Sequence, residues 1–528
     1  MGLVSRDEEE SIHEDEFILL DDILSGTSGV NQKVLQDILT LTILSEEDYD
    51  LIQVSLRLSD FTTLTSSDKI SPILREILSS LQKNKGIPHR VYIQQHTSMT
   101  DGNRYRWKGR MNTPTQEIGA LSVRNRDGVD IINQNSIYVV QNTKNGRWIV
   151  GDHQMAIGFG LVSGKPFPAR KGWSTVNTGT AIYNNGLSGY KSSTGLKRTR
   201  GIAVEKNTDF GLISISGGQT GQTLKRQNNF LRGTWQYKNE ATHMGTVFAQ
   251  GIRSVFASYE LGNIRWGGEL AFGSGSPSLV VGFNYKIRGF KYLVQFRDIY
   301  AESTGAMGNP MVEWKGSDMS ERGIFQGAII RAGKTRIMIY SDVFKHHIRQ
   351  TKGYEFGIRS ETKKGRHHVV FQIKTEKKDK TLVIIYTPIV SPSSANKDGV
   401  KIEHRYDAKN WRTNVKYQFV RAGDIQTDHS HGLDLRFHLY QKNYKIELDW
   451  MMARVGSFDS RIYFWDVNLP GEMLTRVMSR SSHSQGGKVL FNLSNGSRFG
   501  FKIRAVNKNL SFDSGANFSG GIFIQTTL

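Results

Sequence analysis

The feature that most restricts the fold of this 528-residue chain is a two-residue alternation of apolar and polar side chains, which recurs from about residue 102 to the end. Successive side chains of a β-strand point to opposite faces, so each alternating segment predicts a strand with one apolar and one polar face. Clear examples are 279–288, 369–376, 433–440, 444–450 and 499–504. The pattern therefore predicts a mainly β chain built from many half-polar strands.

The connections between these predicted strands are of two kinds. Short turn signals such as Asn145-Gly146, Gly333-Lys334 and Lys364-Gly365 alternate with long polar or aromatic stretches such as 166–197 and 469–485. Tight turns at one end and long loops at the other are typical of a transmembrane β-barrel. At about 20 residues per strand and connection, this part of the chain predicts roughly 18–24 strands. The chain has only 10 prolines, and they are nearly absent from the interiors of the predicted strands, as a closed sheet requires.

We therefore expect residues 102–528 to form one large antiparallel transmembrane β-barrel, with the apolar faces of its strands against lipid. A mean hydropathy of −0.42 is compatible with this, because the lumen face and the loops are polar. Aromatic side chains near predicted strand ends are expected to form interfacial girdles. The examples are Trp148, Tyr300, Trp411, Tyr440 and Trp465. The alternative is a soluble all-β binding protein, in which a second protein layer covers the apolar faces.

The first part of the chain has a different composition and a different period. Residues 1–82 hold 17 acidic and 5 basic residues, a net charge of −12, which leaves a net charge of +32 for the remainder. Such asymmetry favours two separate units. We interpret 1–30 as an acidic, flexible tail. Apolar residues then recur at helical spacing, as in Ile70, Ile73 and Ile77, so 31–85 predicts a small α-helical domain.

Residues 35–52 resemble a helix-hairpin-helix repeat, and 60–64 resemble the link into a second repeat. In that family, glycines in the hairpin expose amides that grip DNA phosphates. Here the turn at 42–45 has no glycine, and the following helix opens with Glu46, Glu47 and Asp48, which repel phosphate. Nucleic acid is therefore disfavoured as a partner of these helices, and a packing or docking role is favoured.

Two motifs in the predicted strands resemble a known family. The first, 148–161, is similar to a "GD-(F/Y)-Q-x-x-F-G-Q-G-L" strand through Gly151, Asp152, Gly158 and Gly160. The second is similar to a "Y-x-x-D-x-P-G" loop through Asp466, Pro470 and Gly471. Both belong to large outer-membrane β-barrels with N-terminal helix-hairpin-helix repeats, mostly from Bacteroidota. The resemblance implies a Gram-negative outer-membrane location with the N-terminal domain in the periplasm.

Basic residues on the polar faces of the strands are the candidate functional side chains. They are Lys286, Arg288, Lys374, Lys416, Arg436, Lys445, Lys502 and Arg504. If the polar face lines a lumen, these residues give it a positive potential that favours anionic solutes. The alternative is that they pair with Glu376, Asp434, Glu447 and Asp449 on neighbouring strands. Both interpretations stay open at this point.

We find no arrangement of residues that predicts catalysis, a metal site or a cofactor. The expected function is a non-enzymatic conduit, or a structural subunit of an envelope complex, with the helical domain as plug or docking module. A DNA-uptake barrel is an alternative, suggested by the helix-hairpin-helix resemblance and the basic barrel. The expected partners are outer-membrane lipid, other envelope proteins and an anionic solute. Met1–Glu10 lacks the pattern of a secretory signal, so we interpret the start as mature or truncated.

Overall fold

The computed structural model describes residues 90–527, apart from a set of short and longer segments. The segments left out are 100–103, 114, 128–129, 165–171, 179–182, 191–197, 221–227, 240, 306–307, 309, 313–319, 349–351, 379–395, 424–427, 442, 458–459, 466–474, 494–496 and 508–516. The predicted acidic tail and the predicted helical domain at 31–85 lie outside the described residues.

Nearly all described elements are β-strands. The first are β1 (Arg90–Met99), β2 (Arg104–Asn112), β3 (Gln116–Asp127), β4 (Asp130–Thr143), β5 (Gly146–Gly158), β6 (Tyr183–Gly189), β7 (Thr199–Thr208), β8 (Gly211–Thr220), β9 (Asn228–Lys238), β10 (Thr242–Ala249), β11 (Ile252–Leu261), β12 (Ile264–Phe272), β13 (Ser278–Ile287) and β14 (Phe290–Ile299). They continue as β15 (Glu321–Ala332), β16 (Thr335–His346), β17 (Lys352–Lys364), β18 (His367–Lys378), β19 (Asn396–Asp407), β20 (Trp411–Ala422), β21 (His429–Tyr440), β22 (Tyr444–Arg454), β23 (Ile462–Trp465), β24 (Thr475–Met478), β25 (Ser482–Asn492), β26 (Arg498–Asn507) and β27 (Asn517–Thr527). The described helices are α6 (Trp173–Thr178) and the 3₁₀ turn Ala301–Ser303.

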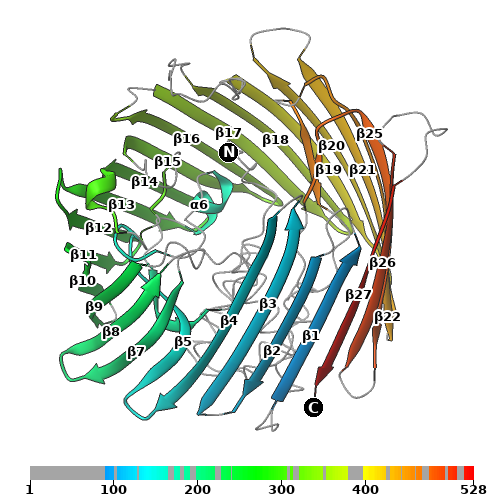
Figure 1. The fold of residues 1–528 in the computed structure, drawn as a ribbon. Helices are drawn as coiled ribbons and strands as arrows, with labels where there is room; N and C mark the ends of the chain where they lie inside the picture. Colours follow the sequence, from blue (N-terminus) through cyan, green and yellow to red (C-terminus); the bar gives the residue numbers. More distant parts are fainter. Residues whose placement is uncertain are drawn as a thin grey trace.

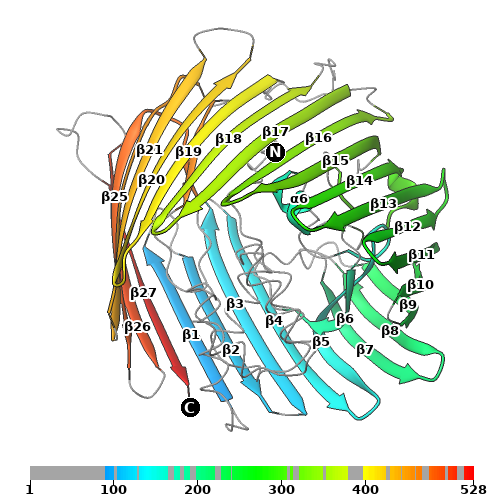
Figure 2. The ribbon, with the colours of Figure 1, turned by 180° about the vertical axis from the view of Figure 1, so that it is seen from behind.

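The strands form a closed antiparallel ring. Neighbours along the chain pair with one another, and the last strand returns to the first, with Tyr92 opposite Thr527 (Figures 1 and 2). Of the 25 strands in this sheet, β6 pairs only with β5, so the ring passes through the other 24. This confirms the prediction of one large antiparallel sheet. The ring already includes β1, so the barrel begins before residue 102.

The two ends of the ring differ as the turn signals predict. At one end the strands join through tight turns, such as those after Thr143, Thr208 and Ala332, and both chain ends of the ring lie there. We call this the tight-turn end. The opposite end carries the longest connections, so we call it the long-loop end. These connections are 159–198, 300–320, 379–395 and 455–481.

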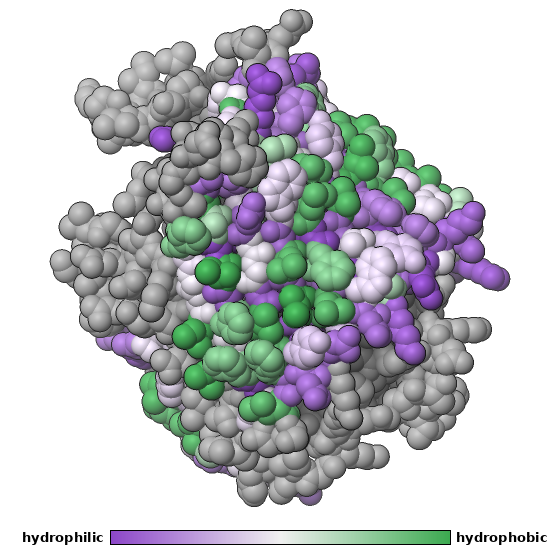
Figure 3. Space-filling model, turned by 90° about the vertical axis from the view of Figure 1, so that its right-hand side faces the viewer, coloured by the Kyte–Doolittle hydropathy of each residue, from purple (hydrophilic) through white to green (hydrophobic). Residues whose placement is uncertain are grey.

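The two faces of the ring have opposite polarity. On β13, Val281 is exposed on the outer face, whereas its neighbour Val280 is buried on the inner face. Many exposed large apolar side chains lie on the outer face, and the inner face holds buried charged residues such as Glu269, Arg297 and Asp342. Figure 3 shows apolar side chains gathered on the outer face at the right of Figure 1. The alternation read from the sequence is therefore an outward apolar and inward polar pattern.

Aromatic side chains surround the outer face near the tight-turn end. Neighbouring strands bring Tyr259 and Trp266 into contact, and likewise Tyr406 and Trp411, with ring centroids 6.3 and 5.1 Å apart. Trp148 is exposed on the same face. Tyr440 was expected in such a girdle, but by alternation it lies on the inner face, where the Arg412 guanidinium lies over its ring. Among the described helices, none has the length and apolarity to cross a bilayer.

Candidate functional site

Part of the chain leaves the wall and folds into the ring. Residues 146–151 of β5 pair with both β4 and β7, His153 pairs with β7 and β6, and 154–158 pair with β6 alone. The chain then continues through α6, which lies inside the ring in both ribbon views (Figures 1 and 2). We call residues 153–190 the inward segment, of which 165–171 and 179–182 are not described.

Gly151 and Asp152, two residues of the family-like motif, lie where the inward segment leaves the wall. Gly151 has a φ of 102°, and a Cβ there would lie 2.2 Å from the Ile137 carbonyl oxygen. The backbone at this point therefore requires glycine. The Asp152 carboxylate is fully buried and accepts hydrogen bonds from Arg200 Nε at 2.8 Å and from the Ile137 amide at 3.2 Å. This pair thus fixes the start of the bend.

Gly158 and Gly160, the other two described motif residues, shape the turn that follows β5. Both have positive φ, 67° and 84°. This turn presents the amides of Phe159 and Leu161 to one carboxylate oxygen of Glu269, at 2.7 and 3.2 Å. Ser254 donates a hydrogen bond to the other oxygen at 2.7 Å. Because Glu269 belongs to β12, a wall carboxylate holds the tip of the inward segment by charge-assisted hydrogen bonds.

Two further charged wall residues hold the same segment. Arg232 of β9 is fully buried, and its Nη1 donates a hydrogen bond to Ser163 Oγ at 2.6 Å. Glu205 of β7 accepts the Leu187 amide at 3.0 Å and pairs with Arg147 Nε at 3.0 Å. Buried charged groups are costly unless they are paired. The wall charges and the backbone of the inward segment therefore stabilise each other.

Apolar packing fixes the helix of the inward segment. Trp173 meets the ring of Tyr340 edge-on, with centroids 4.6 Å apart, and Val176 is fully buried. Gly327 of β15 makes room for this contact, since a Cβ there would lie 2.6 Å from Val176 Cγ2. Tyr340 in turn donates a hydrogen bond to Glu355 at 2.6 Å. The helix is short, so its position depends on this packing and not on intrinsic helix stability.

A second insertion comes from the connection between β22 and β25. Its hairpin, β23 and β24, buries Ile462 and Phe464, which lie where a side chain on Gly432 would otherwise be. Lys416 of β20 lies 5.6 Å from the centroid of the Phe464 ring. The hairpin therefore packs on the inner face of β20 and β21. Asp466, Pro470 and Gly471 of the second family-like motif lie outside the described residues.

The structure places the eight predicted basic residues in different surroundings. Arg504 pairs with Asp449 at 2.5 Å, Arg436 with Asp434 at 2.9 Å, and Lys374 with Glu355 at 3.3 Å. Lys416 lies against Phe464, and Lys445 lies 5.7 Å from the ring centroid of Tyr440. Lys502 is half-buried on the inner face, and Lys286 and Arg288 are exposed at the tight-turn end. Arg504, Arg436 and Lys374 are thus paired with wall carboxylates.

Sequence reasoning missed the charged residues that hold the inward segment. Glu205, Arg232 and Glu269 all sit on the polar side of alternating segments, so the alternation contained the signal for their face. It contained no signal that a loop from another part of the chain would contact them. Among the described residues, no cluster of three or more His, Cys, Asp or Glu side chains is placed to bind a metal ion.

Comparisons with known proteins give structural likeness only. No family model and no curated protein matches the sequence. A BenF-like porin from Pseudomonas fluorescens Pf-5 is 8% identical over 84% of this chain and 98% of its own, with a TM-score of 0.31. The outer membrane protein OprD from Pseudomonas aeruginosa is 8% identical over 83% and 93%, with a TM-score of 0.31. An E. coli P pilus tip assembly intermediate, PapC-PapD-PapK-PapG, contains a chain 10% identical over 84% and 61%, with a TM-score of 0.46. Since these TM-scores are below 0.5, the function of this chain has to be inferred from its own geometry.

Proposed function

We propose that this chain is a non-enzymatic outer-membrane β-barrel conduit whose lumen is closed at the long-loop end by the inward segment and the β23–β24 hairpin. The tight-turn end faces the periplasm in this proposal, because short turns lie on that side of outer-membrane barrels. The N-terminal residues 1–89 then also lie in the periplasm, since β1 begins at the tight-turn end.

The observation that supports membrane insertion is the closed ring with apolar side chains outside and charged side chains inside. Ile202, Leu231 and Val343 are all at least 60% exposed on the outer face. A soluble all-β protein would cover such side chains with a second layer, whereas the described α6 and the β23–β24 hairpin contact the inner face of the ring. Lipid also requires every backbone group to be paired within the protein, which ring closure between β1 and β27 achieves.

The width of the ring supports a conduit that is gated from within. Barrels of 16–18 strands already leave an aqueous channel, and those of 22 strands hold a plug. The ring of this chain passes through 24 strands, so side chains of the wall alone cannot fill it. The inward segment supplies the filling at the long-loop end.

The first experiment tests the class of protein. We expect the full chain to fractionate with outer membranes and to migrate differently on a gel before and after boiling, as folded barrels do. Solubility as a compact particle without detergent would refute membrane insertion, and the conduit proposal with it.

The second experiment tests the closure. His153 and Thr199 are directly opposite each other on β5 and β7, so a short turn can replace residues 154–198 without disturbing the wall register. We expect this variant to give large, steady conductance in planar bilayers, whereas the full chain gives small or intermittent conductance. A shortened chain that conducts no better than the full one, although correctly folded, would refute closure by this segment.

The proposal also assigns roles to the N-terminal helical domain, which docks at the tight-turn mouth, and to the solute, which is anionic. The opposite charges of residues 1–82 and of the barrel favour docking of the helical domain at the tight-turn mouth, where Lys286 and Arg288 are exposed. These cations also favour anionic solutes. Deletion of 1–85 should raise conductance if the domain plugs this mouth, and reversal potentials in asymmetric salt should show anion preference. Unchanged values would leave a structural or docking role within an envelope complex.

A further inference from the structure

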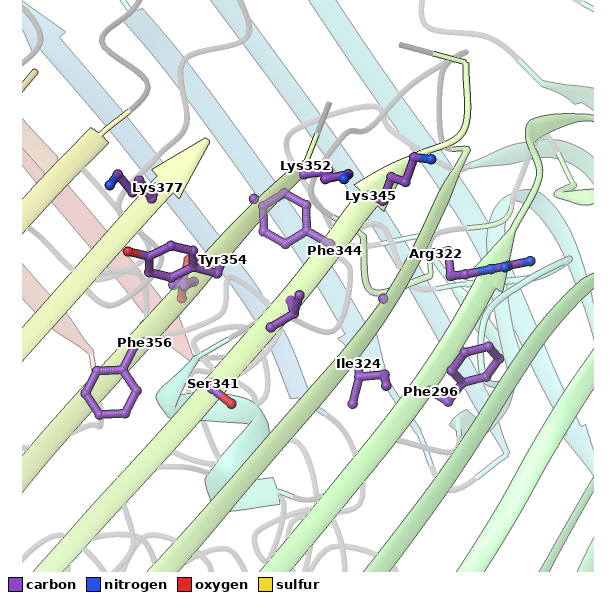
Figure 4. A pocket seen from close by; sticks show the side chains of 14 residues that line it. Phe296, Arg322, Ile324, Ser341, Phe344, Lys345, Lys352, Tyr354, Phe356 and Lys377 are labelled. Carbon is purple, nitrogen blue, oxygen red and sulfur yellow. The ribbon is translucent and has the colours of Figure 1, made fainter. Parts of the chain in front are cut away.

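A groove of about 690 Å³ lies on the outer face of the wall at β15, β16 and β17 (Figure 4). Its floor is apolar, with Ile324, Val343 and Tyr354 in one row across the three strands. All three are more than 40% exposed, whereas the alternate residues Phe325 and Phe344 are buried on the inner face. The groove therefore faces away from the lumen.

The floor of the groove is hollowed where one small side chain, Ser341, lies between larger ones. In the next row towards the tight-turn end, Ser341 lies between Gln326 and Phe356. Ser341 fills little of the space that an apolar residue would take. This leaves a slot bordered by Phe356 on one side and Ile324 on the other (Figure 4).

Basic side chains line the edge of the groove at the long-loop end. Arg322, Lys345 and Lys352 are direct cross-strand partners on β15, β16 and β17, and Figure 4 shows them above the apolar floor. Lys377 of β18 lies opposite Tyr354 and extends the basic edge. Like charges directly opposite each other in a sheet are destabilising. The pairing of Lys345 with Lys352 therefore favours binding of an anion.

The described residues supply only part of the compensating negative charge. Arg322 pairs with Asp298 at 2.5 Å, and Asp298 also contacts His347 at 2.8 Å. Within the described part of the chain, no carboxylate is within ion-pair distance of Lys345, Lys352 or Lys377. Glu355 lines the groove but points to the inner face, where it binds Tyr340 and Lys374. Three exposed lysines thus stand beside an exposed apolar slot.

We propose that this groove binds one phosphorylated glycolipid of the lipid A type, with phosphate between the lysines and an acyl chain along the apolar floor. The inference rests on the proposed membrane location, because it places the groove in the leaflet at the long-loop end. Both halves of the site match such a lipid: cations lie at the level of the headgroup, and the slot runs from there towards the middle of the wall. Basic pockets on membrane proteins bind lipid phosphates in this way.

The test is a titration of the full chain in detergent with lipid A, followed by native mass spectrometry. The main variant is Lys345→Gln/Lys352→Gln/Lys377→Gln. We expect about fivefold weaker binding per lysine, and on the order of a hundredfold for the three together. The control variant removes the same charge from the tight-turn end, by Lys206→Gln/Lys334→Gln/Lys364→Gln, and should change binding less than about twofold.

A second variant and two further ligands separate the headgroup from the chain. Ser341→Trp fills the slot and keeps every cation. It should therefore weaken lipid A binding although the charge of the groove is unchanged. Dephosphorylated lipid A should bind poorly, and inorganic phosphate should compete only weakly. Equal binding of the dephosphorylated lipid, an unaffected triple-lysine variant, or lipid A binding that is unchanged by Ser341→Trp would overturn the proposal. A chain that is heat-modifiable and conducts, yet binds no lipid A, refutes only this inference. A chain that never inserts refutes the proposed function first.

Discussion

Removal of the Glu269 carboxylate should open the barrel. In the Glu269→Ala variant, the amides of Phe159 and Leu161 lose the oxygen that accepts both of them, and Ser254 loses its acceptor. A buried donor left without an acceptor costs about 1–3 kcal/mol. Two such amides weaken the docking of the inward segment by about 2–6 kcal/mol. About 1.4 kcal/mol corresponds to a tenfold change in an equilibrium constant, so the ratio of open to closed barrels should rise at least about 30-fold.

The Glu269→Gln variant refines this prediction. An amide oxygen can still accept the two backbone N–H groups, and its NH₂ group can donate to the Ser254 hydroxyl. Only the part of the hydrogen-bond energy that depends on charge is lost, so the open fraction should rise less than about tenfold. The open probability is therefore expected to be lowest in the wild type, higher in Glu269→Gln and highest in Glu269→Ala.

The assay is single-channel recording in planar bilayers, with the gel shift on boiling as a check of folding. Glu447→Ala is the matched control, because Glu447 is also a buried carboxylate but pairs with Lys488 and Arg436 of the wall. We expect this control to lower stability without a change in open probability. If Glu269→Ala folds and its open probability equals that of the wild type, Glu269 does not hold a gate.

Three further predictions concern the wall and the helix. Val281→Arg, near the middle of β13 on the outer face, should destabilise the barrel in vesicles by about 2–4 kcal/mol, whereas Ile287→Arg at the strand end should destabilise it by about 0–1 kcal/mol. Equal losses of stability would contradict lipid contact. Arg504→Ala removes the guanidinium that pairs with buried Asp449 and should cost about 3–5 kcal/mol in urea unfolding, and Arg504→Met/Asp449→Leu should recover most of it. Trp173→Ala removes the edge-on contact with Tyr340 and should make α6 accessible to protease while the boiling-dependent gel shift persists; full protection would count against the packing described.

The architecture of the wall could be predicted because its signals are local. A strand with one apolar and one polar side repeats every two residues, so Val281 and Val280 were assigned to opposite faces from 279–288 alone. The tight turns after Thr143 and Ala332 are likewise marked by glycine within a few residues. Both kinds of signal lie within one strand or one turn.

The lumen could not be predicted in the same way, because its contacts join residues far apart in sequence. Glu269 and Phe159 meet only because the turn after β5 folds across the ring to β12. No periodicity records that contact, and Gly158 and Gly160, whose positive φ shapes the turn, entered the prediction only as residues of a family-like motif. The predicted lumen cations had the same difficulty. Alternation gave their face and Asp449 as one candidate partner, but it did not assign Asp449 to Arg504, which lies two strands away on β26.

The pairing of Tyr92 with Thr527 has a consequence for how the protein is made. The two strands that close the ring are the first and the last of the sheet, so every earlier intermediate has two unpaired edges. Open edges recruit strands from other chains, and in hydrocarbon each unsatisfied backbone group costs several kcal/mol. Assembly therefore depends on shielding the nascent sheet until β27 arrives, and loss of that strand should give aggregates instead of a smaller pore.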